Sequence, residues 1–465
     1  MRNSGRDLVR IAFITSVLLI GATFCAIDAQ QAEIAFVDVT VIPMDRERVL
    51  AHRTVVVRNA RIVAIGPVGD VAVGAGVRRI DGKGKYLLPG LADMHAHLGR
   101  PEGIEAYPLL LVANGVTTVR NMFGNSSVLA LRERIQDGTT LGPQIYTTGP
   151  IMEGKNGTPV ADRIIETAAE AERAVASDKE GGYDAIKVYN MLSSEAYEAT
   201  MRAARRSGLP VYGHVPISVG IEGALGAHQA SVEHLSGYIQ ALQPDGSPFK
   251  NSAPSRMRPQ YIEHVDLGGL KRLANLTRDA DVWNCPTLVI FQHQELTAAA
   301  AQRRLLLPEM KYMPAARIKS WETEIESANS RLKDEDVPLY AKADEVRMRV
   351  VKALHDAGAR LLLGTDFPPA FTAPGYSLHE ELSNFVAAGL SPYEALRAGT
   401  SGAAEFLGKS GEFGVIAAGA RADVLLLEGN PLDDVRNAAK RAGVMVRGEW
   451  YTEGELRERL DKLPR

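Results

Sequence analysis

Residues 85–98 read KYLLPGLADMHAHL, an apolar run that is typical of a buried strand and that ends in two histidines one residue apart. Side chains alternate between the two faces of a strand, so His95 and His97 point to the same side. Two imidazoles on one side can bind one divalent metal ion. Paired histidines are also common in cores and on surfaces, so the function of this pair depends on the rest of the chain.

Downstream of this stretch, short β-branched runs alternate with segments of helical pattern, which is the signature of a parallel sheet with crossover helices. Eight βα units close a (β/α)8 TIM barrel. An open, doubly wound sheet has the same alternation and stays possible on this count. The candidate strands span residues 87–97, 116–122, 144–149, 185–190, 211–215, 231–235, 282–290 and 360–366.

The two ends of the chain differ in pattern from its centre. Residues 35–80 and 413–451 consist of short β-rich runs broken by turn residues, which is typical of hairpin strands. We interpret them as one small β-sandwich domain, built from both chain ends around the inserted barrel, in an α/β architecture. The expected boundaries are a signal peptide at 1–29, sandwich parts at 30–88 and 411–465, and the barrel at 89–410.

The composition is that of a soluble globular protein. Hydrophobic residues make up 45% and charged residues 23% of the 465 residues, so the chain can bury a large core. The net charge of −3 and the lack of a long basic run argue against nucleic acid as a partner. We expect a small-molecule substrate, and a homo-oligomer is possible.

The first thirty residues have the layout of a secretory signal peptide. Basic residues precede an apolar run at 11–26, and small residues follow around Ala29. An uncleaved anchor is the alternative, because Ile27 disfavours cleavage after Ala29. No other run is long enough to span a bilayer. The prediction is a secreted or periplasmic protein without membrane association after cleavage.

Residues that can bind metal lie at or near the ends of several candidate strands. They are His95 and His97 on the first strand, Lys187 on the fourth, His214 on the fifth, His234 on the sixth and Asp366 on the eighth. The chain has ten histidines, and four of them occupy such positions. In a barrel the carboxyl ends of the strands open into one mouth, where active sites lie. These six side chains are therefore predicted to form one metal site.

Six ordered motifs resemble the amidohydrolase superfamily, in particular its imidazolonepropionase-like and prolidase-like members. The motifs are PGLADMHAHLG, GVTTVRNM, AIKVYN, VYGHVP, SVEHL and LLLGTDFP. The resemblance implies one ion on His95, His97 and Asp366, a second on His214 and His234, and a bridging carboxylated Lys187. Two zinc ions are expected, with manganese, iron or cobalt as alternatives. One departure is Asn121, where the family pattern leads us to expect an aspartate.

The chemistry predicted for such a site is hydrolysis of an amide or peptide-like C–N bond by a metal-bound hydroxide. Asp366 is the candidate proton shuttle, and a dipeptide or N-acyl amino acid is the expected substrate. Weaker candidates for substrate contact, each equally compatible with a structural role, are Arg120, Tyr189, Tyr212 and His293. A mononuclear cyclic-amide hydrolase or deaminase is the alternative if Lys187 stays a free amine. An inactive binding protein on the same fold is the alternative of another class.

Overall fold

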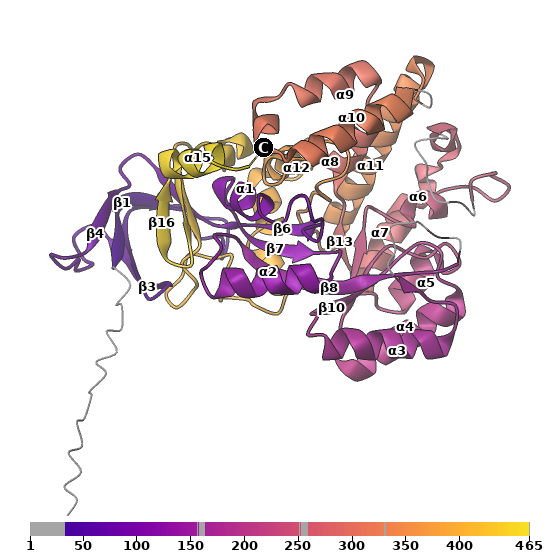
Figure 1. Ribbon diagram of the computed structural model, residues 1–465, viewed down its shortest axis with the longest axis horizontal. Helices are drawn as coiled ribbons and strands as arrows, with labels where there is room; N and C mark the ends of the chain where they lie inside the picture. The colour runs from indigo at the N-terminus through magenta and orange to yellow at the C-terminus, as the bar shows by residue number, and fades with distance from the viewer. Residues whose placement is uncertain are drawn as a thin grey trace, which may run out of the picture. The chain divides into compact units, whose positions relative to one another are not determined.

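The described part of the chain begins at the first strand of the amino-terminal β-rich region. The computed structural model describes residues 33–155, 157, 163–250, 252, 259–329 and 332–464, drawn as ribbon in Figure 1. The signal peptide predicted at 1–29 lies outside the described residues. Among the helices that are described, none combines the length and the apolar character that crossing a membrane requires.

Parallel strands form a nearly closed barrel. In sequence order they are β6 (Leu91–Ala96), β7 (Val116–Asn121), β8 (Gln144–Glu153), β10 (Ala185–Val188), β11 (Val211–Gly213), β12 (Ser231–Glu233) and β13 (Trp283–Cys285), with β9 (Arg163–Ile164) paired to β8. The segment 360–367 completes the ring by bonding to both neighbours. Leu362 N donates to Asn284 O at 2.8 Å on the β13 side. Met94 N donates to Leu363 O at 2.8 Å on the β6 side. The prediction of a (β/α)8 barrel is confirmed.

Residues 85–98 contain two strands that belong to different sheets. β5 (Tyr86–Pro89) pairs with the β domain, and β6 (Leu91–Ala96) enters the barrel. Gly90 joins them and donates its N–H to Asp423 O at 2.9 Å. A side chain at this position would collide with Thr117, which explains the glycine. One apolar run therefore supplies a strand to the β domain and a strand to the barrel.

The predicted strand at 282–290 is shorter than the sequence pattern suggested. Pairing stops at Cys285, and α8 (Leu288–Gln294) begins three residues later. Pro286 lacks the N–H that would continue the ladder. Thr287 adopts a left-handed φ of 50°, which turns the chain into the helix. The apolar residues after Cys285 thus belong to a buried helix rather than a strand.

Helices connect the barrel strands and pack around them (Figure 1). They are α1 (Tyr107–Ala113), α2 (Ser126–Gln136), α3 (Ala168–Glu180), α4 (Ser194–Ser207), α5 (Gly220–Gly226), α6 (Tyr238–Ala241), α7 (Leu270–Asp279), α8, α9 (Ala298–Leu305), α10 (Ala315–Asn329), α11 (Val337–Ala357), α12 (Tyr376–Ala387), α13 (Pro392–Ala398) and α14 (Ser401–Phe406). Short 3-10 helices occupy Pro259–His264, Leu267–Gly269, Pro308–Tyr312, Asp334–Asp336 and Val435–Ala439. The local sequence explains where several of the helices begin, because capping residues precede them. Thr167 and Glu170, for example, form a capping box at α3.

The β domain combines strands from both ends of the chain, which confirms the prediction. Its strands are β1 (Ile34–Val41), β2 (Leu50–Arg58), β3 (Arg61–Pro67), β4 (Arg78–Asp81), β5, β14 (Val424–Leu427), β15 (Arg441–Val446) and β16 (Glu449–Thr452), followed by α15 (Glu453–Asp461). β5 pairs antiparallel with β14, with Leu88 opposite Leu425. Phe36 and Trp450 pack edge to face in the core, with ring centroids 5.2 Å apart.

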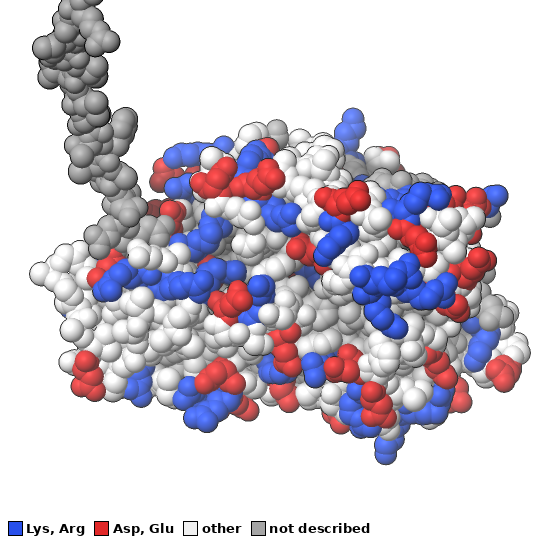
Figure 2. All heavy atoms as spheres, turned by 90° about the horizontal axis from the view of Figure 1, so that it is seen from below, with Lys and Arg blue, Asp and Glu red and all other residues white. Residues whose placement is uncertain are grey.

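Charged side chains are mixed on the face shown in Figure 2, where lysines and arginines lie among aspartates and glutamates. Many surface charges are also paired, such as Arg206 with Glu172 at 2.9 Å. On the described part of this face, neither sign of charge forms an extended patch.

Candidate active site

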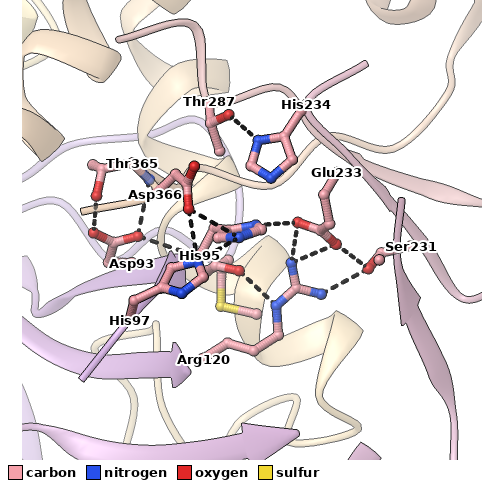
Figure 3. A network of polar contacts seen from close by, with 12 residues as sticks. Asp93, His95, His97, Arg120, Ser231, Glu233, His234, Thr287, Thr365 and Asp366 are labelled. Atoms are coloured by element: carbon pink, nitrogen blue, oxygen red, sulfur yellow. Dashed lines mark hydrogen bonds and ion pairs between the residues drawn. The ribbon is translucent and has the colours of Figure 1, made fainter. Parts of the chain in front are cut away.

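His95, His97 and Asp366 lie together at the carboxyl ends of β6 and of the segment 360–367 (Figure 3). His95 Nε2 and His97 Nε2 are 3.3 Å apart. Asp366 Oδ1 is 2.7 Å from His97 Nε2 and 3.3 Å from His95 Nε2. Ligand atoms bonded to one tetrahedral zinc ion are about 3.3 Å apart, given bonds of about 2.05 Å. Two of the three distances equal this spacing, and the third, from Asp366 to His97, is a direct contact that a shared divalent ion would lengthen.

The histidines of β11 and β12 border this cluster. His234 lies with its ring centroid 4.4 Å from that of His95 and 4.8 Å from that of His214. His234 Nδ1 is 2.7 Å from Thr287 Oγ1, and His214 Nδ1 is 2.8 Å from Asn190 Oδ1. Because one ring nitrogen of each histidine is held by a neighbour, Nε2 is left to bind a metal. The sequence prediction placed both histidines at this end of the barrel.

Burial keeps these imidazoles neutral. It lowers the pKa of His95 and of His214 well below the usual value, and nearby Lys187 lowers both further. Burial also lowers the pKa of His234 to about 4, against the opposing charge of Asp366. A neutral imidazole is the form that binds metal. His95, His214 and His234 are therefore in the neutral form, which can bind metal, near pH 7.

Lys187 is an isolated amine inside the barrel. Its side chain is buried on β10, and Nζ has no hydrogen-bond partner among the described residues. Burial lowers the pKa of Lys187 to about 8, although Glu233 and Asp366 oppose the shift. A buried amine without a partner is costly, whereas a carbamate made from it could share two oxygens with metal ions. The orphaned amine therefore fits a modified, bridging lysine.

Left-handed backbone occurs at three residues of the site. His234, Thr287 and Asp366 have φ values of 61°, 50° and 60°. Such conformations cost a non-glycine residue of the order of 1–3 kcal/mol and gather at functional sites. Asp366 N donates to His95 O at 2.7 Å, which holds the strained turn in place. Burial would raise the pKa of Asp366, but His234 and His97 outweigh it and lower the pKa, so the carboxylate stays ionised.

A buried ion pair supports His95 from beneath (Figure 3). Glu233 Oε2 is 2.7 Å from His95 Nδ1. Arg120 donates to both oxygens of Glu233 at 2.8 and 2.9 Å. Ser231 Oγ donates to Glu233 Oε1 at 2.5 Å. Sequence reasoning missed Glu233. The sequence did contain an indication of its role. Glu233 precedes His234 at the end of a strand that is buried in the barrel, and a buried carboxylate requires a hydrogen-bonding or charged partner.

Two further polar side chains fix the ends of neighbouring strands. Asp93 accepts hydrogen bonds from His95 N at 3.1 Å and from Thr365 Oγ1 at 2.7 Å. Asn121 Oδ1 accepts from Leu98 N at 2.7 Å, and its Nδ2 donates to Thr147 Oγ1 at 2.9 Å. A neutral amide satisfies both neighbours, which gives Asn121 a positioning role where an aspartate was expected.

The four weaker candidates for substrate contact lie in different places. Tyr189 lines a cavity next to the cluster and stacks on His214 at 3.8 Å. Arg120 is 1% exposed and faces Glu233 instead of the cavity. Tyr212 is buried below it, with the Arg120 guanidinium 4.8 Å from its ring centroid. His293 is buried against Glu380 at 2.7 Å. Of the four, Tyr189 alone is among the residues that line the cavity.

The cavity itself has a volume of about 240 Å³ and is bordered by His214, His234 and Asp366. Its outer wall includes Arg347 of α11, which sequence reasoning missed. Arg347 donates to Glu295 through Nη1 at 2.8 Å and Nη2 at 2.5 Å, and its guanidinium lies 4.1 Å from the Phe291 ring centroid. This ion pair holds α11 against α8 at the edge of the cavity.

The Glu233–Arg120 pair gives a first prediction. Glu233→Ala is expected to lower the free energy of unfolding by about 3–5 kcal/mol, because it leaves the buried Arg120 guanidinium without a counter-ion. It should also weaken metal binding by roughly 10–100-fold, since His95 loses the group that orients it. Chemical denaturation of metal-free protein and competition with a chelator measure the two effects.

The matched control is Glu172→Ala, which removes one partner of an exposed ion pair on α3. Exposed pairs contribute about 0–1 kcal/mol, so both measurements should stay close to those of the unmodified protein. Equal losses of stability in the two variants would contradict a special role for Glu233.

Comparison with known proteins assigns the chain to a family. The amidohydrolase family matches residues 86–451. Imidazolonepropionase from Rubrobacter xylanophilus is 24% identical over 394 residues, which cover 82% of this chain and 85% of that protein. The crystal structure of a Xaa-Pro dipeptidase with bound methionine in its active site covers 90% of this chain and 100% of that one, with a TM-score of 0.66 and 19% identity.

The fold is also that of bottromycin amidohydrolase, with a TM-score of 0.71 and 24% identity over 92% of this chain and 88% of that one. These solved structures support the barrel and the β domain described above. The family match covers most of the chain, including all six predicted metal-site residues. The chain therefore belongs to the amidohydrolase family and is a hydrolase of carbon–nitrogen bonds.

Proposed function

We propose that this protein is a metal-dependent hydrolase that cleaves an amide or peptide-like bond of a small substrate at a binuclear centre. One observation carries the proposal: the ligand atoms of His95, His97 and Asp366 lie within 3.3 Å of one another. His214 and His234 adjoin this cluster, and the unpartnered Lys187 amine is buried at the same site. These histidines, the carboxylate and the unpartnered amine support the proposal of a metal centre.

The residues divide into two ligand sets. His95, His97 and Asp366 would hold one ion, and His214 and His234 the other. Lys187 would be shared between them after its amine takes up CO2 and releases a proton, which replaces a cation by an anionic ligand. Bound divalent ions supply Lewis acidity and lower the pKa of a coordinated water from about 16 to about 7. Zinc suits these nitrogen and oxygen donors, and manganese, iron and cobalt are compatible with them.

Asp366 is the proposed proton carrier. Its carboxylate contacts His97 and also borders the cavity, so one group reaches both the ligand cluster and the substrate. Its lowered pKa keeps the carboxylate ionised and able to accept a proton from the attacking water. Delivery of this proton to the leaving nitrogen would complete cleavage of the C–N bond.

The cavity supports a small, partly apolar substrate. The cavity has a volume of about 240 Å³, and its lining includes the apolar side chains of Ile239, Ile290 and Phe291 as well as Tyr189, which stacks on His214. We propose a dipeptide or an N-acyl amino acid, and the shared fold with a Xaa-Pro dipeptidase agrees with this choice. The relation to imidazolonepropionase favours a second candidate, in which one ion serves hydrolysis or deamination of a cyclic nitrogen compound.

Export is a further part of the proposal. The signal-peptide pattern at residues 1–29 leads us to propose a secreted or periplasmic enzyme. Fractionation of expressing cells, combined with the mass of the mature amino terminus, tests this. Full-length protein retained in the cytosol would contradict it.

Metal analysis and substrate profiling test the proposed reaction together. Protein purified without chelators is expected to carry about two divalent ions per chain and to hydrolyse members of a dipeptide and N-acyl amino acid library. One ion per chain together with turnover of cyclic amides would favour the second candidate. Metal-loaded protein that turns over neither library would favour an inactive binding protein on this fold.

A further inference from the structure

A second cavity lies where the β domain meets the barrel helices. It has a volume of about 360 Å³ and shares none of its lining residues with the active-site cavity. Its walls come from the end of α1, the 3-10 helix at 308–312, the start of α12, the start of β15, and α15. Figure 1 shows α15 beside α1, and the two helices are in contact.

Arg441 lines this cavity, and the groups that bond to its guanidinium are uncharged. Its Nε donates to Ala113 O at 3.1 Å, its Nη2 donates to Asn114 Oδ1 at 3.2 Å, and its Nη1 lies 3.1 Å from His379 Nε2. All three partners are uncharged groups, and burial lowers the pKa of His379 to about 3. Glu453, the acid whose charge acts on Arg441, forms its ion pair with Arg457 instead. Two of its five N–H groups have no partner in the described part of the chain.

The other cations of the cavity are already paired. Arg457 is 3.1 Å from Glu453, and Lys311 is 3.2 Å from Asp461. Two charged groups of the wall, the guanidinium of Arg441 and the carboxylate of Glu309, form no ion pair among the described residues. Glu309 is partly buried and has no ion-pair partner among the described residues. Both charges face one space without being paired to each other.

Both groups are partly buried, so each has lost part of its hydration without gaining an ion pair in return. A cation and an anion that border one cavity are complementary to a ligand that carries both charges. Leu456, Leu460 and Pro308 add an apolar wall. The volume is large enough for one amino acid. An anion without an ammonium group would leave Glu309 unmatched.

We propose that this cavity binds a free α-amino acid with an apolar side chain. The carboxylate would bond to Arg441, the ammonium group would face Glu309, and the side chain would contact the leucines of α15. The site would be separate from the catalytic centre, and the proposal does not rest on the reaction assigned to that centre.

Calorimetric titration of the full-length, metal-loaded protein tests the proposal with three probes. They are L-leucine, 4-methylpentanoate, which lacks the ammonium group, and 3-methylbutylamine, which lacks the carboxylate. L-Leucine is expected to bind about tenfold more tightly than either analogue, since each analogue loses one charge-assisted contact. Equal affinity for L-leucine and 4-methylpentanoate would overturn the proposed zwitterion.

Substitutions of the cavity residues test whether L-leucine binds in the second cavity. Arg441→Gln should abolish L-leucine binding, and Glu309→Gln should reduce it to the level of 4-methylpentanoate. Arg457→Gln is the matched control, because it removes a charge of the same cavity that Glu453 already balances; its affinity should stay within about threefold of the unmodified protein. If Arg441→Gln does not fold, Arg441→Lys keeps the charge and should bind more weakly than the unmodified protein but still measurably.

Binding at the active site is the competing explanation, and Asp366→Asn separates the two. L-Leucine binding that persists in Asp366→Asn and disappears in Arg441→Gln supports the second cavity. Binding that disappears in Asp366→Asn and persists in Arg441→Gln would overturn it.

Discussion

Lys187→Ala is expected to abolish turnover and to lower the metal content from about two ions per chain to about one. The variant removes the buried amine that would become the shared carbamate, so the charge of the second ion would lose its compensation. A loss of roughly 10³-fold or more in kcat is expected, which is the scale on which an electrostatic catalytic group acts. Metal analysis and steady-state kinetics on the same preparation measure both effects.

Added short carboxylates sharpen this test. Acetate or propionate is expected to restore part of the activity of Lys187→Ala, because a small carboxylate can occupy the space that the side chain vacates. Lys179→Ala is the control, since it removes an exposed lysine of α3 and should leave metal content and turnover unchanged. Full activity of Lys187→Ala without any added carboxylate would remove the bridge from the mechanism.

The clustering of the candidate metal-site residues could be predicted from the sequence because of the way in which barrels are built. Parallel strands place their carboxyl ends together, so residues far apart in sequence meet once the strands are recognised. His214 and His234 directly follow two short strands that are separated by one helix, and both border the same cavity in the structure. The position of each residue relative to its strand determines this convergence, whereas the packing of the helices does not affect it.

The supporting residues were harder to predict, because periodicity gives the face on which a residue lies but not its partner. Arg120 was considered for substrate contact, yet it bonds Glu233, which lies 113 positions along the chain. Arg347 reaches the cavity from the long helix α11, whose packing no local pattern specifies. Arg441 meets Asn114 only because the chain ends fold back on the barrel.

A glycine and a proline also changed the extent of two strands that the hydrophobic pattern had predicted. Gly90 divided one apolar run between two sheets, and Pro286 ended another in favour of a helix. In both cases the hydrophobic pattern correctly predicted burial and wrongly predicted the extent of the strand. Glycine and proline act through backbone geometry, which apolar periodicity does not detect.

Asp366→Asn is expected to retain part of the metal but to lower kcat by about 10²–10⁴-fold. The amide oxygen can still act as a ligand, whereas an uncharged amide cannot accept the proton from water. The contacts of Asp366 with His95 and His97 explain why some metal should remain. Metal content and kcat, measured at saturating metal, separate these two functions of one side chain.

Asp279→Asn serves as the control for this substitution, because it makes the same chemical change at the exposed end of α7 and should leave both measurements unchanged. If Asp366→Asn lost metal and activity in proportion, Asp366 would be a ligand without a role in proton transfer. If it kept full turnover, the proton would have to travel through another group at the cavity. In the described structure Tyr189 also borders that cavity, but burial raises its pKa far above the working range, so it cannot replace a carboxylate base. A large fall in kcat at nearly unchanged metal content therefore remains the expected result.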